Sequence, residues 1–201
     1  MIVIVDYGMG NLGSIVNMFK KIGVKASISS DAETLADAPK LLLPGVGAFD
    51  KAMERIATSG LRPILDELVL VQKKPILGIC LGTQLLTRGS EEGKLPGLGW
   101  IPASTKRFPT IPGLRIPHMG WNRVYPSSPS AITRELPEES RFYFVHSYCV
   151  QTDFAVHSLL KCHYGIDFDA AIQKENIYGA QFHPEKSHRF GMQLLKNFAS
   201  L

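Results

Sequence analysis

The sequence has few cysteines and no long uncharged hydrophobic stretch, and each absence excludes a class of protein. Its three cysteines, Cys80, Cys149 and Cys162, form no CxxC pair, which argues against structural disulfides and a zinc site and favours free thiols in a reducing compartment. No apolar run approaches the roughly 20 residues that span a bilayer. The apolar start, MIVIVDYGMG, lacks a basic segment and a cleavage site, and instead predicts a first strand. We therefore expect a soluble, cytoplasmic protein without a membrane partner.

A strong excess of one charge is also missing. The chain has 22 Lys and Arg against 18 Asp and Glu, for a net charge of +4, and the basic residues are scattered. This pattern indicates a solvated surface, so we expect no nucleic-acid partner. The sequence contains no internal repeat or low-complexity segment. Its 201 residues are enough to bury one core, which predicts a single domain over residues 1–201.

Strand-like and helix-like patterns alternate through the first half of the chain. Apolar strand candidates occur at residues 1–8, 25–29, 41–45 and 75–79, and helical patterns occur near 11–23, 31–38, 48–57 and 60–72. Such alternation requires parallel strands with helices packed on both faces. We therefore predict an α/β fold with a mostly parallel central sheet, flavodoxin-like in character.

The second half of the chain differs from the first in its proline content and in the length of its strand-like segments. Eight prolines lie between residues 96 and 137, and short strand-like pieces such as RFYFVHSYCV follow them. These features predict additional antiparallel or edge strands beside the parallel sheet. The last segment, residues 187–201, has apolar side chains at helical spacing, which predicts a final helix facing the core.

Cys80 lies between two glycines where a predicted strand passes into a predicted helix, in the stretch GICLG. This G-x-nucleophile-x-G form is typical of a nucleophile elbow, in which small neighbours allow a strained turn that exposes the central side chain. The start of the helix would also favour a thiolate there. Taken alone, the pentapeptide fits a small buried cysteine as well as a nucleophile.

A cysteine nucleophile needs a base, and the stretch FHPEK supplies His183 with Glu185 two residues later. In an extended segment, positions i and i+2 lie on one side, so the carboxylate can orient the imidazole and stabilise its cation. A surface histidine beside a turn proline is the alternative for this segment alone.

The stretch PGVG supplies glycines after another predicted strand, at Gly45 and Gly47. Such a turn can present backbone N–H groups to a carbonyl oxygen, as an oxyanion hole requires, with a second donor from the N–H of Leu81. An ordinary glycine-rich turn would have the same composition.

The three stretches PGVG, GICLG and FHPEK, in this order, resemble those of class I (triad) glutamine amidotransferase domains, and the resemblance covers nearly the whole chain. It implies a Cys80, His183 and Glu185 triad that hydrolyses L-glutamine to glutamate and ammonia. It also implies that no cofactor or metal takes part. The remaining residues that the resemblance assigns are Val46, Gly47 and Leu81 for the oxyanion hole, and Gly45, Gln84, Glu92, Ser147 and Tyr148 for glutamine binding.

Within this family, the stretches DYGMGN, IPHMGWN, YFVHSY and HPEKS are most similar to the glutaminase subunits of imidazole glycerol phosphate synthases. The similarity implies a heterodimer with a (β/α)8-barrel cyclase that uses the ammonia to make imidazole glycerol phosphate and AICAR in histidine biosynthesis. It also implies a partner interface at His118, Met119, Trp121, Asn122 and Lys186, although His118 and Trp121 equally suit packing.

Two departures leave the ammonia acceptor open. The family usually has an aromatic residue where this chain has Cys149, and the segments at 164–179 and 187–198 resemble paralogues found with surface-sugar biosynthesis. These paralogues are thought to supply ammonia to a sugar-modifying synthase. The histidine-pathway partner and a sugar-modifying partner therefore both remain candidates.

Two other functions compete with this interpretation. The stretch GMGNLG has the G-x-G-x-x-G form of a dinucleotide-binding loop, with Asp31 downstream, but Asp6 places a carboxylate near the expected pyrophosphate. A cysteine peptidase would share the triad chemistry. A catalytically inactive binding module is disfavoured by the intact triad.

Overall fold

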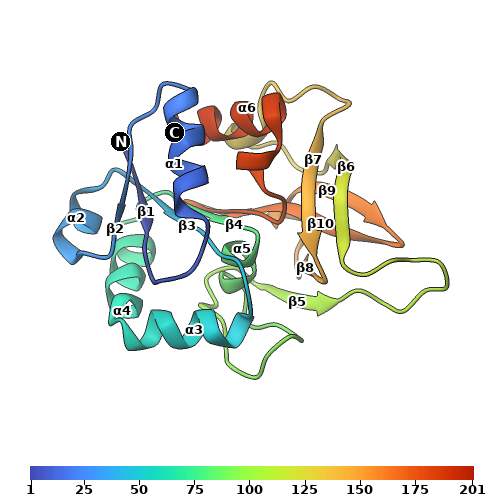
Figure 1. Cartoon of the computed structure of the whole chain (residues 1–201), viewed down its shortest axis with the longest axis horizontal. Coiled ribbons are helices and arrows are strands. Elements are labelled where there is room, and N and C mark those ends of the chain that lie inside the picture. Colours follow the sequence, from blue (N-terminus) through green and yellow to red (C-terminus); the bar gives the residue numbers. More distant parts are fainter.

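Eleven strands form one mixed β-sheet in the computed structural model, which describes residues 1–201 (Figure 1). The strands are β1 (Ile2–Val5), β2 (Ala26–Ser29), β3 (Lys40–Leu43), β4 (Ile76–Ile79), β5 (Ala103–Arg107), β6 (His118–Pro126), β7 (Arg141–His146), β8 (Tyr148–Thr152), β9 (Ser158–Tyr164), β10 (Ile166–Lys174) and β11 (Ile177–Ala180). The α-helices are α1 (Leu12–Lys21), α2 (Ala32–Asp37), α3 (Phe49–Thr58), α4 (Leu61–Asp66), α5 (Leu81–Leu85) and α6 (His188–Ala199). No helix is long and apolar enough to cross a membrane.

Strands β2, β1, β3, β4 and β11 lie side by side in that order, and all neighbours among them are parallel. Their apolar side chains alternate between the two faces of the sheet. Ile2 and Ile4 pack with α1 and α6, whereas Val3 and Val5 pack with α2, α3, α4 and α5. Figure 1 shows α1 and α6 on one side of the sheet and α3 and α4 on the other. Burial on both faces explains why β1, β3 and β4 are almost continuously apolar, whereas β2, at the edge of the sheet, is only partly buried and contains two serines.

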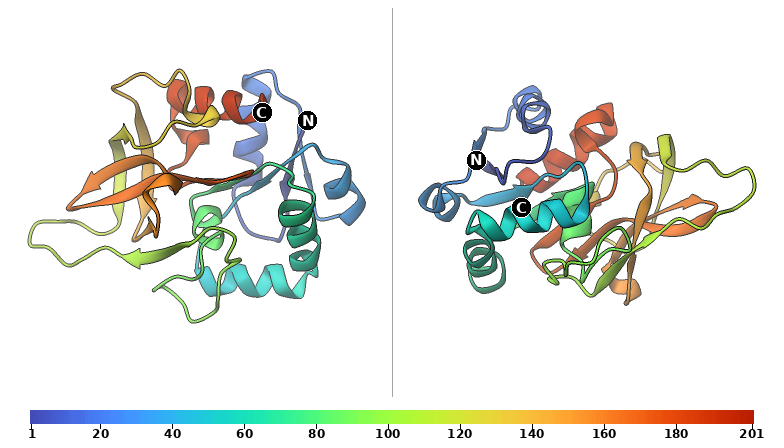
Figure 2. Two further views of the ribbon diagram at one scale, coloured as in Figure 1. Left: turned by 180° about the vertical axis from the view of Figure 1, so that it is seen from behind. Right: turned by 60° about the horizontal axis from the view of Figure 1, so that its bottom comes forward.

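The second half of the chain extends the sheet with antiparallel strands. Strand β10 pairs with β11 on one side and with β9 on the other, and β6 and β7 follow. Strands β5 and β8 form a branch that joins the sheet at β10. Figure 2 shows this antiparallel region at the end of the molecule away from β2. The predicted α/β fold, with a parallel core and added antiparallel strands, is confirmed.

Local boundaries differ from the sequence prediction in three places. Strand β3 ends at Leu43 because Pro44 has no N–H to donate to a neighbouring strand. The helix predicted over 60–72 divides into α4 and a π-helical turn, Glu67–Val71. The segment RFYFVHSYCV divides into β7 and β8 on either side of Ser147. After this division β7 pairs with β6, whereas β8 pairs with β5 and β10.

Candidate active site

Cys80 occupies a strained turn between β4 and α5. Its φ of 52° and ψ of −109° lie outside the regions that a non-glycine residue normally adopts. The flanking glycines are required because the backbone approaches closely: a Cβ on Gly78 would lie 2.7 Å from the Gly82 carbonyl oxygen, and a Cβ on Gly82 would overlap the Leu43 carbonyl oxygen. The predicted elbow is therefore present, with Cys80 at its apex.

The substitution Gly82→Ala tests this close packing. The added methyl group must displace the Leu43 backbone, so we expect a loss of about 1–3 kcal/mol in the free energy of unfolding. Gly13→Ala is the matched control, because a Cβ at Gly13 meets no atom within 4 Å and Ala stabilises a helix by about 0.5–1 kcal/mol relative to Gly. Urea unfolding measures both. Equal stability of the Gly82→Ala and parent proteins would contradict the packing argument.

His183 and Glu185 form a buried hydrogen-bonded pair beyond the end of β11. The Nδ1 atom of His183 lies 2.7 Å from Oε1 of Glu185, and both side chains are only 3% exposed. This contact leaves Nε2 as the other functional atom of the imidazole, and Nε2 makes no well-aligned hydrogen bond within the protein. Cys80 and His183 line the same pocket. The three side chains that the sequence assigns to a triad are thus brought together.

The charges around His183 favour its protonated form. Burial opposes the charge, but the interactions with the Cys80 sulfur and the Glu185 carboxylate outweigh it and raise the pKa of His183 to about 9. The imidazole is therefore mostly protonated at neutral pH. An imidazolium next to a cysteine stabilises the thiolate form of that cysteine, which is the nucleophilic form.

The loop after β3 supplies unused backbone donors beside Cys80. Val46 and Gly47 line the same pocket as Cys80, and their N–H groups donate to no other protein atom. Gly47 has a φ of +104°, a conformation that favours glycine. Leu81 is the first residue of α5, so its N–H has no acceptor within the helix. This arrangement offers two sources of donors to an oxygen near Cys80.

Four of the residues predicted to bind glutamine line this pocket of about 360 Å³: Gln84, Glu92, Ser147 and Tyr148. Gly45, the fifth, is buried and does not line it, because Gly45 packs against the elbow, where a Cβ would lie 2.7 Å from Gly82 N. Glu92 also has a structural contact, since its Oε2 accepts from Phe49 N at 3.1 Å at the start of α3. Partial burial raises the pKa of Glu92.

The residues predicted at a partner interface divide into two groups. Met119, Trp121 and Lys186 are exposed, as an interface requires. The expectation that His118 faces a partner is wrong for its side chain, which is 2% exposed. Strand alternation turns His118 inward, and the Asn122 amide turns with it to donate to His118 Nε2 and to the His163 carbonyl.

His118 belongs to a chain of buried hydrogen bonds that reaches the pocket. The Tyr148 carbonyl can only accept, so His146 donates to it from Nδ1 at 2.7 Å. His146 Nε2 then accepts from Nδ1 of His118 at 2.9 Å. Burial lowers the pKa of His118 to about 4 and that of His146 to about 3, so both rings are neutral. His146 lines the pocket beside Ser147.

This histidine pair predicts acid sensitivity. Both folded-state pKa values lie below the ordinary value of 6.5, so the unfolded chain binds protons that the folded chain excludes. The stabilisation is complete above about pH 6.5 and declines as the pH falls toward 4. Between pH 7 and 5 we expect a loss of about 2 kcal/mol for each ring. Urea unfolding measures it, and the double variant His118→Phe/His146→Phe should show a shallower pH dependence. Parallel pH profiles for the two proteins would contradict the assignment.

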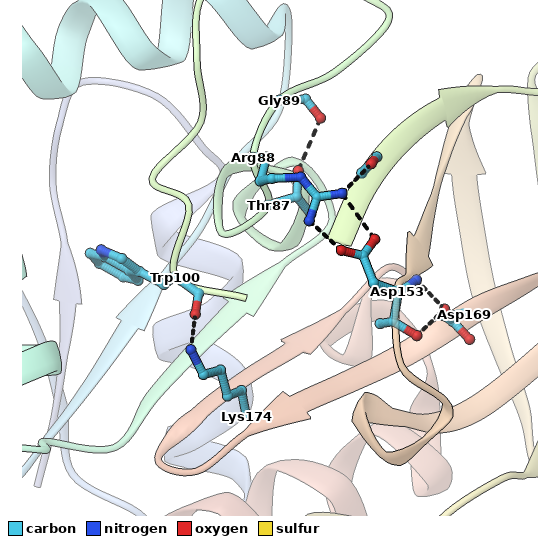
Figure 3. Close-up of polar contacts among 9 residues, drawn as sticks. Thr87, Arg88, Gly89, Trp100, Asp153, Asp169 and Lys174 are labelled. Atoms are coloured by element: carbon cyan, nitrogen blue, oxygen red, sulfur yellow. Dashed lines mark hydrogen bonds and ion pairs between the residues drawn. The ribbon is translucent and has the colours of Figure 1, made fainter. Parts of the chain in front are cut away.

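Polar contacts on the far side of α5 fix the strand that carries Tyr148. Arg88, just after α5, forms an ion pair and hydrogen bonds with Asp153, which follows β8. The buried carboxylate of Asp169 accepts from the N–H of Thr152, at the end of β8, at 2.7 Å. Figure 3 shows these contacts, together with the hydrogen bond that the Thr87 hydroxyl donates to the Gly89 carbonyl. The helix that begins at the elbow and the strand that lines the pocket are thereby held together.

Sequence reasoning missed four residues that contribute to the pocket or its support. Pro117, Val145 and His146 line the pocket, and Tyr7 donates a hydrogen bond to the Pro44 carbonyl just before the loop of Val46 and Gly47. The burial of His146 could have been predicted from the sequence, because His146 alternates with the apolar Phe142 and Phe144 and so lies on the same face of its strand. The contact of Tyr7 with Pro44 could not, because no local pattern links residues 37 positions apart.

Comparison with known proteins agrees with this geometry. The family model for glutamine amidotransferase class-I matches residues 3–200. The chain is 50% identical over 201 residues to imidazole glycerol phosphate synthase subunit HisH 2 of Pseudomonas aeruginosa, covering 100% of both chains. It is 52% identical over 198 residues to subunit HisH 2 of Methanococcus maripaludis (98% of both chains) and 48% identical over 204 residues to subunit HisH of Bdellovibrio bacteriovorus (100% of both).

Solved structures share the fold at low sequence identity. A crystal structure of a glutamine amidotransferase superposes with a TM-score of 0.77 at 18% identity, covering 99% of both chains. The structure of PurLQS from Thermotoga maritima superposes with a TM-score of 0.70, also at 18% identity, covering 99% of this chain and 97% of that one. With the match of the family model to residues 3–200, these findings assign the chain: it belongs to the class-I glutamine amidotransferase family.

Proposed function

We propose that the chain, as one domain over residues 1–201, is the glutaminase subunit of an imidazole glycerol phosphate synthase, and that Cys80, His183 and Glu185 are its catalytic triad. The observation that carries the proposal is the elbow itself: Cys80 has a left-handed φ of 52° and shares a pocket with His183 and the unpaired amides of Val46 and Gly47. The full-length similarity to named HisH subunits supports the choice of enzyme.

The first half of the proposed reaction forms a thioester. The Cys80 thiolate attacks the side-chain carbonyl carbon of L-glutamine, and the negative charge that develops on the oxygen is met by the N–H groups of Val46 or Gly47 and of Leu81. The C–N bond then breaks, and the imidazolium of His183 gives its Nε2 proton to the departing nitrogen. Ammonia leaves, and a glutamyl thioester remains on Cys80.

The second half of the reaction releases glutamate. Neutral His183 takes a proton from a water molecule, and the oxygen attacks the thioester carbonyl in the same oxyanion hole. The C–S bond breaks, glutamate leaves, and Cys80 returns to the thiolate beside protonated His183. Glu185 keeps the imidazole in one orientation through both halves and stabilises its cation.

The pocket residues suit the polar ends of glutamine. Gln84 and Glu92 lie on the pocket wall with Ser147 and Tyr148, so an ammonium and a carboxylate would each find partners of opposite polarity. Gln84 is held in place by its own donation to the Tyr148 carbonyl at 3.0 Å. We propose that these four residues bind the amino acid end of the substrate.

The partner in this proposal is a cyclase subunit that receives the ammonia and makes imidazole glycerol phosphate and AICAR. The exposed side chains of Met119 and Trp121 on β6, and of Lys186 beyond β11, would contact it. We further propose that docking reorients a peptide group in the loop Pro44–Gly47 and thereby completes the oxyanion hole. The barrel fold of the partner follows from the sequence resemblance.

The experiment is to measure ammonia release by the isolated chain and by its mixture with the cyclase subunit from the same genome. We expect little glutamine turnover alone, and a strong increase when the cyclase is added. High activity of the isolated chain would contradict activation by docking. Absence of turnover in both samples, with a folded protein and a formed complex, would overturn the glutaminase proposal.

A sugar-modifying synthase is the second candidate for the ammonia acceptor. Two of the similar relatives are named HisH 2, a numeral that marks a second copy of the subunit. The sugar-modifying alternative requires such a second copy, one that supplies ammonia to a different pathway. Growth of a histidine auxotroph that lacks its own glutaminase subunit distinguishes the two. Restored growth without histidine supports the cyclase partner, and failure to restore growth, with a sugar-modifying synthase copurifying, supports the alternative.

A further inference from the structure

The loop between β1 and α1, which carries the GMGNLG stretch, packs against the loop Pro44–Gly47. A Cβ on Gly10 would lie 3.2 Å from the Pro44 side chain, and Gly10 has a φ of +118°. Gly13, the third glycine of the motif, has open space around it, whereas a dinucleotide-binding loop uses its third glycine for close helix–strand packing. Gly10 therefore allows the close approach of this loop to its neighbour, the proposed oxyanion loop.

Tyr7 connects the two loops through one short hydrogen bond. Its side chain is buried, with 3% exposure, and its hydroxyl donates to the Pro44 carbonyl oxygen at 2.6 Å. The same hydroxyl oxygen lies 3.0 Å from the position of a Cβ on Gly45. Burial, with a contribution from the Cys80 sulfur, raises the pKa of Tyr7, so the phenol keeps its proton and remains a donor.

Met9 contacts the other end of the same loop. Its terminal methyl carbon, Cε, lies 3.0 Å from the position of a Cβ on Gly47. Two side chains from the loop after β1 thus touch the start and the end of the segment that contains the unpaired amides of Val46 and Gly47. A peptide group held at both ends has less freedom to rotate than one in an open glycine-rich turn.

We propose that Tyr7 is a positioning residue, which anchors the start of the loop Pro44–Gly47 through its hydrogen bond to the Pro44 carbonyl, so that the peptide group that docking reorients is held in reach of the oxyanion. The inference rests on the proposed glutaminase function and deepens it. Tyr7 does not touch the substrate, since it does not line the pocket. It acts through the backbone that it holds.

This role predicts an effect on turnover and not on substrate binding. The oxyanion exists only along the reaction path, so donors that meet it stabilise the transition state more than bound glutamine. Loss of a whole oxyanion-hole donor costs about 10²- to 10³-fold in kcat. A donor that is still present but less well placed should cost less, about 10-fold, with KM unchanged.

The test is the variant Tyr7→Phe, measured in the complex with the cyclase subunit. The substitution keeps the aromatic ring and removes only the hydroxyl group. The matched control is Tyr164→Phe, which removes another phenol that donates to a backbone carbonyl, that of Arg115, at the same 2.6 Å. We expect kcat to fall about 10-fold for Tyr7→Phe with KM unchanged, and neither value to change for Tyr164→Phe.

Alkylation of Cys80 by iodoacetamide separates positioning from general damage. This reaction uses the thiolate but forms no oxyanion, so its rate should be the same in Tyr7→Phe and in the parent protein. Hydrogen exchange of the backbone amide of Gly45, which is buried directly after Pro44, should become faster in the variant. Unchanged kcat with unchanged exchange would overturn the proposal, and so would a loss of alkylation as large as the loss of kcat.

Hydrogen exchange also keeps this inference separate from the proposed function. If the parent complex releases no ammonia from glutamine, the glutaminase proposal fails, while exchange of the buried Gly45 amide still decides whether Tyr7 anchors the loop. Faster exchange in Tyr7→Phe, with no change at 180–183, supports the anchor. Equal exchange in both proteins refutes it.

Discussion

Replacing Cys80 with alanine abolishes ammonia release from glutamine in the complex with the cyclase subunit. Without the sulfur no thioester forms, and the oxyanion donors and His183 have no nucleophile to assist. Removing a triad nucleophile lowers kcat by about 10⁶-fold in the best-studied serine hydrolase, so we expect a fall of at least about 10⁴-fold here. A coupled assay of glutamate formation measures the change, with purified protein at high concentration to reveal any residual rate.

The other two cysteines supply the control. Cys162 is buried, and burial raises the pKa of its thiol to about 12; the thiol of Cys149 is also buried, with its pKa raised to about 12. Both are therefore protonated and poorly nucleophilic at neutral pH. Cys162→Ala should keep most of the glutaminase activity while losing some stability. Activity retained in Cys80→Ala, or lost in Cys162→Ala with the fold intact, would contradict the assigned nucleophile.

The second large effect is expected for Glu185→Gln. The amide has the size of the carboxylate but no charge, so it neither raises the pKa of His183 nor holds the donor tautomer at Nδ1. The corresponding change in a serine protease triad lowers kcat by about 10⁴-fold; we expect a decrease of about 10²- to 10⁴-fold. The measurement is kcat for glutamine in the complex, from pH 6 to 10.

The pH profile gives a second signature of the same substitution. Protonated His183 is needed to release ammonia, so activity should decline as the pH rises through the pKa of about 9. Glu185 is one of the groups that raise this pKa, and its loss should move the alkaline limb of the profile to lower pH. An unchanged limb in Glu185→Gln would show that the carboxylate does not act on the imidazole. Glu175→Gln is the matched control, since Glu175 forms an exposed ion pair with Lys73.

Much of the fold followed from the sequence because the parallel strands are apolar on both faces. In β1, Ile2 and Ile4 pack against the helices on one face of the sheet, and Val3 and Val5 pack against those on the other. A strand of this kind appears in the sequence as a short apolar run between helical patterns. The antiparallel region was predicted only in outline. Its pairing of β10 with three different strands depends on contacts between segments that no local pattern encodes.

The elbow and its partners were predictable because their chemistry is local. The small residues Gly78 and Gly82 on either side of Cys80 predict a tight turn. His183 and Glu185 are two positions apart in the sequence, and this spacing places His183 Nδ1 and Glu185 Oε1 at 2.7 Å. Contacts between distant segments were not predictable in this way. Tyr7 reaches Pro44 across 37 positions, and the glycine motif that surrounds it matched a dinucleotide-binding pattern by composition.

His118 shows how a resemblance can be right about a segment and wrong about a side chain. The strand β6 has its exposed residues at Met119, Trp121 and Arg123, and its buried ones at His118 and Val124. Period-2 alternation alone favours the opposite orientation, because it would place the apolar Met119 and Trp121 inward and His118 outward. Only the structure shows that His118 points inward, where it meets the Nε2 atom of His146.

The most direct test of the triad assignment is covalent labelling with a diazoketone analogue of glutamine. The analogue enters as the substrate does, and its reactive carbon alkylates the catalytic sulfur with loss of nitrogen gas. We predict that one label per chain appears on the peptide containing Cys80, that glutaminase activity disappears in proportion, and that added glutamine protects against both. Labelling of Cys149 or Cys162 alone, or full activity after Cys80 is completely labelled, would contradict the account.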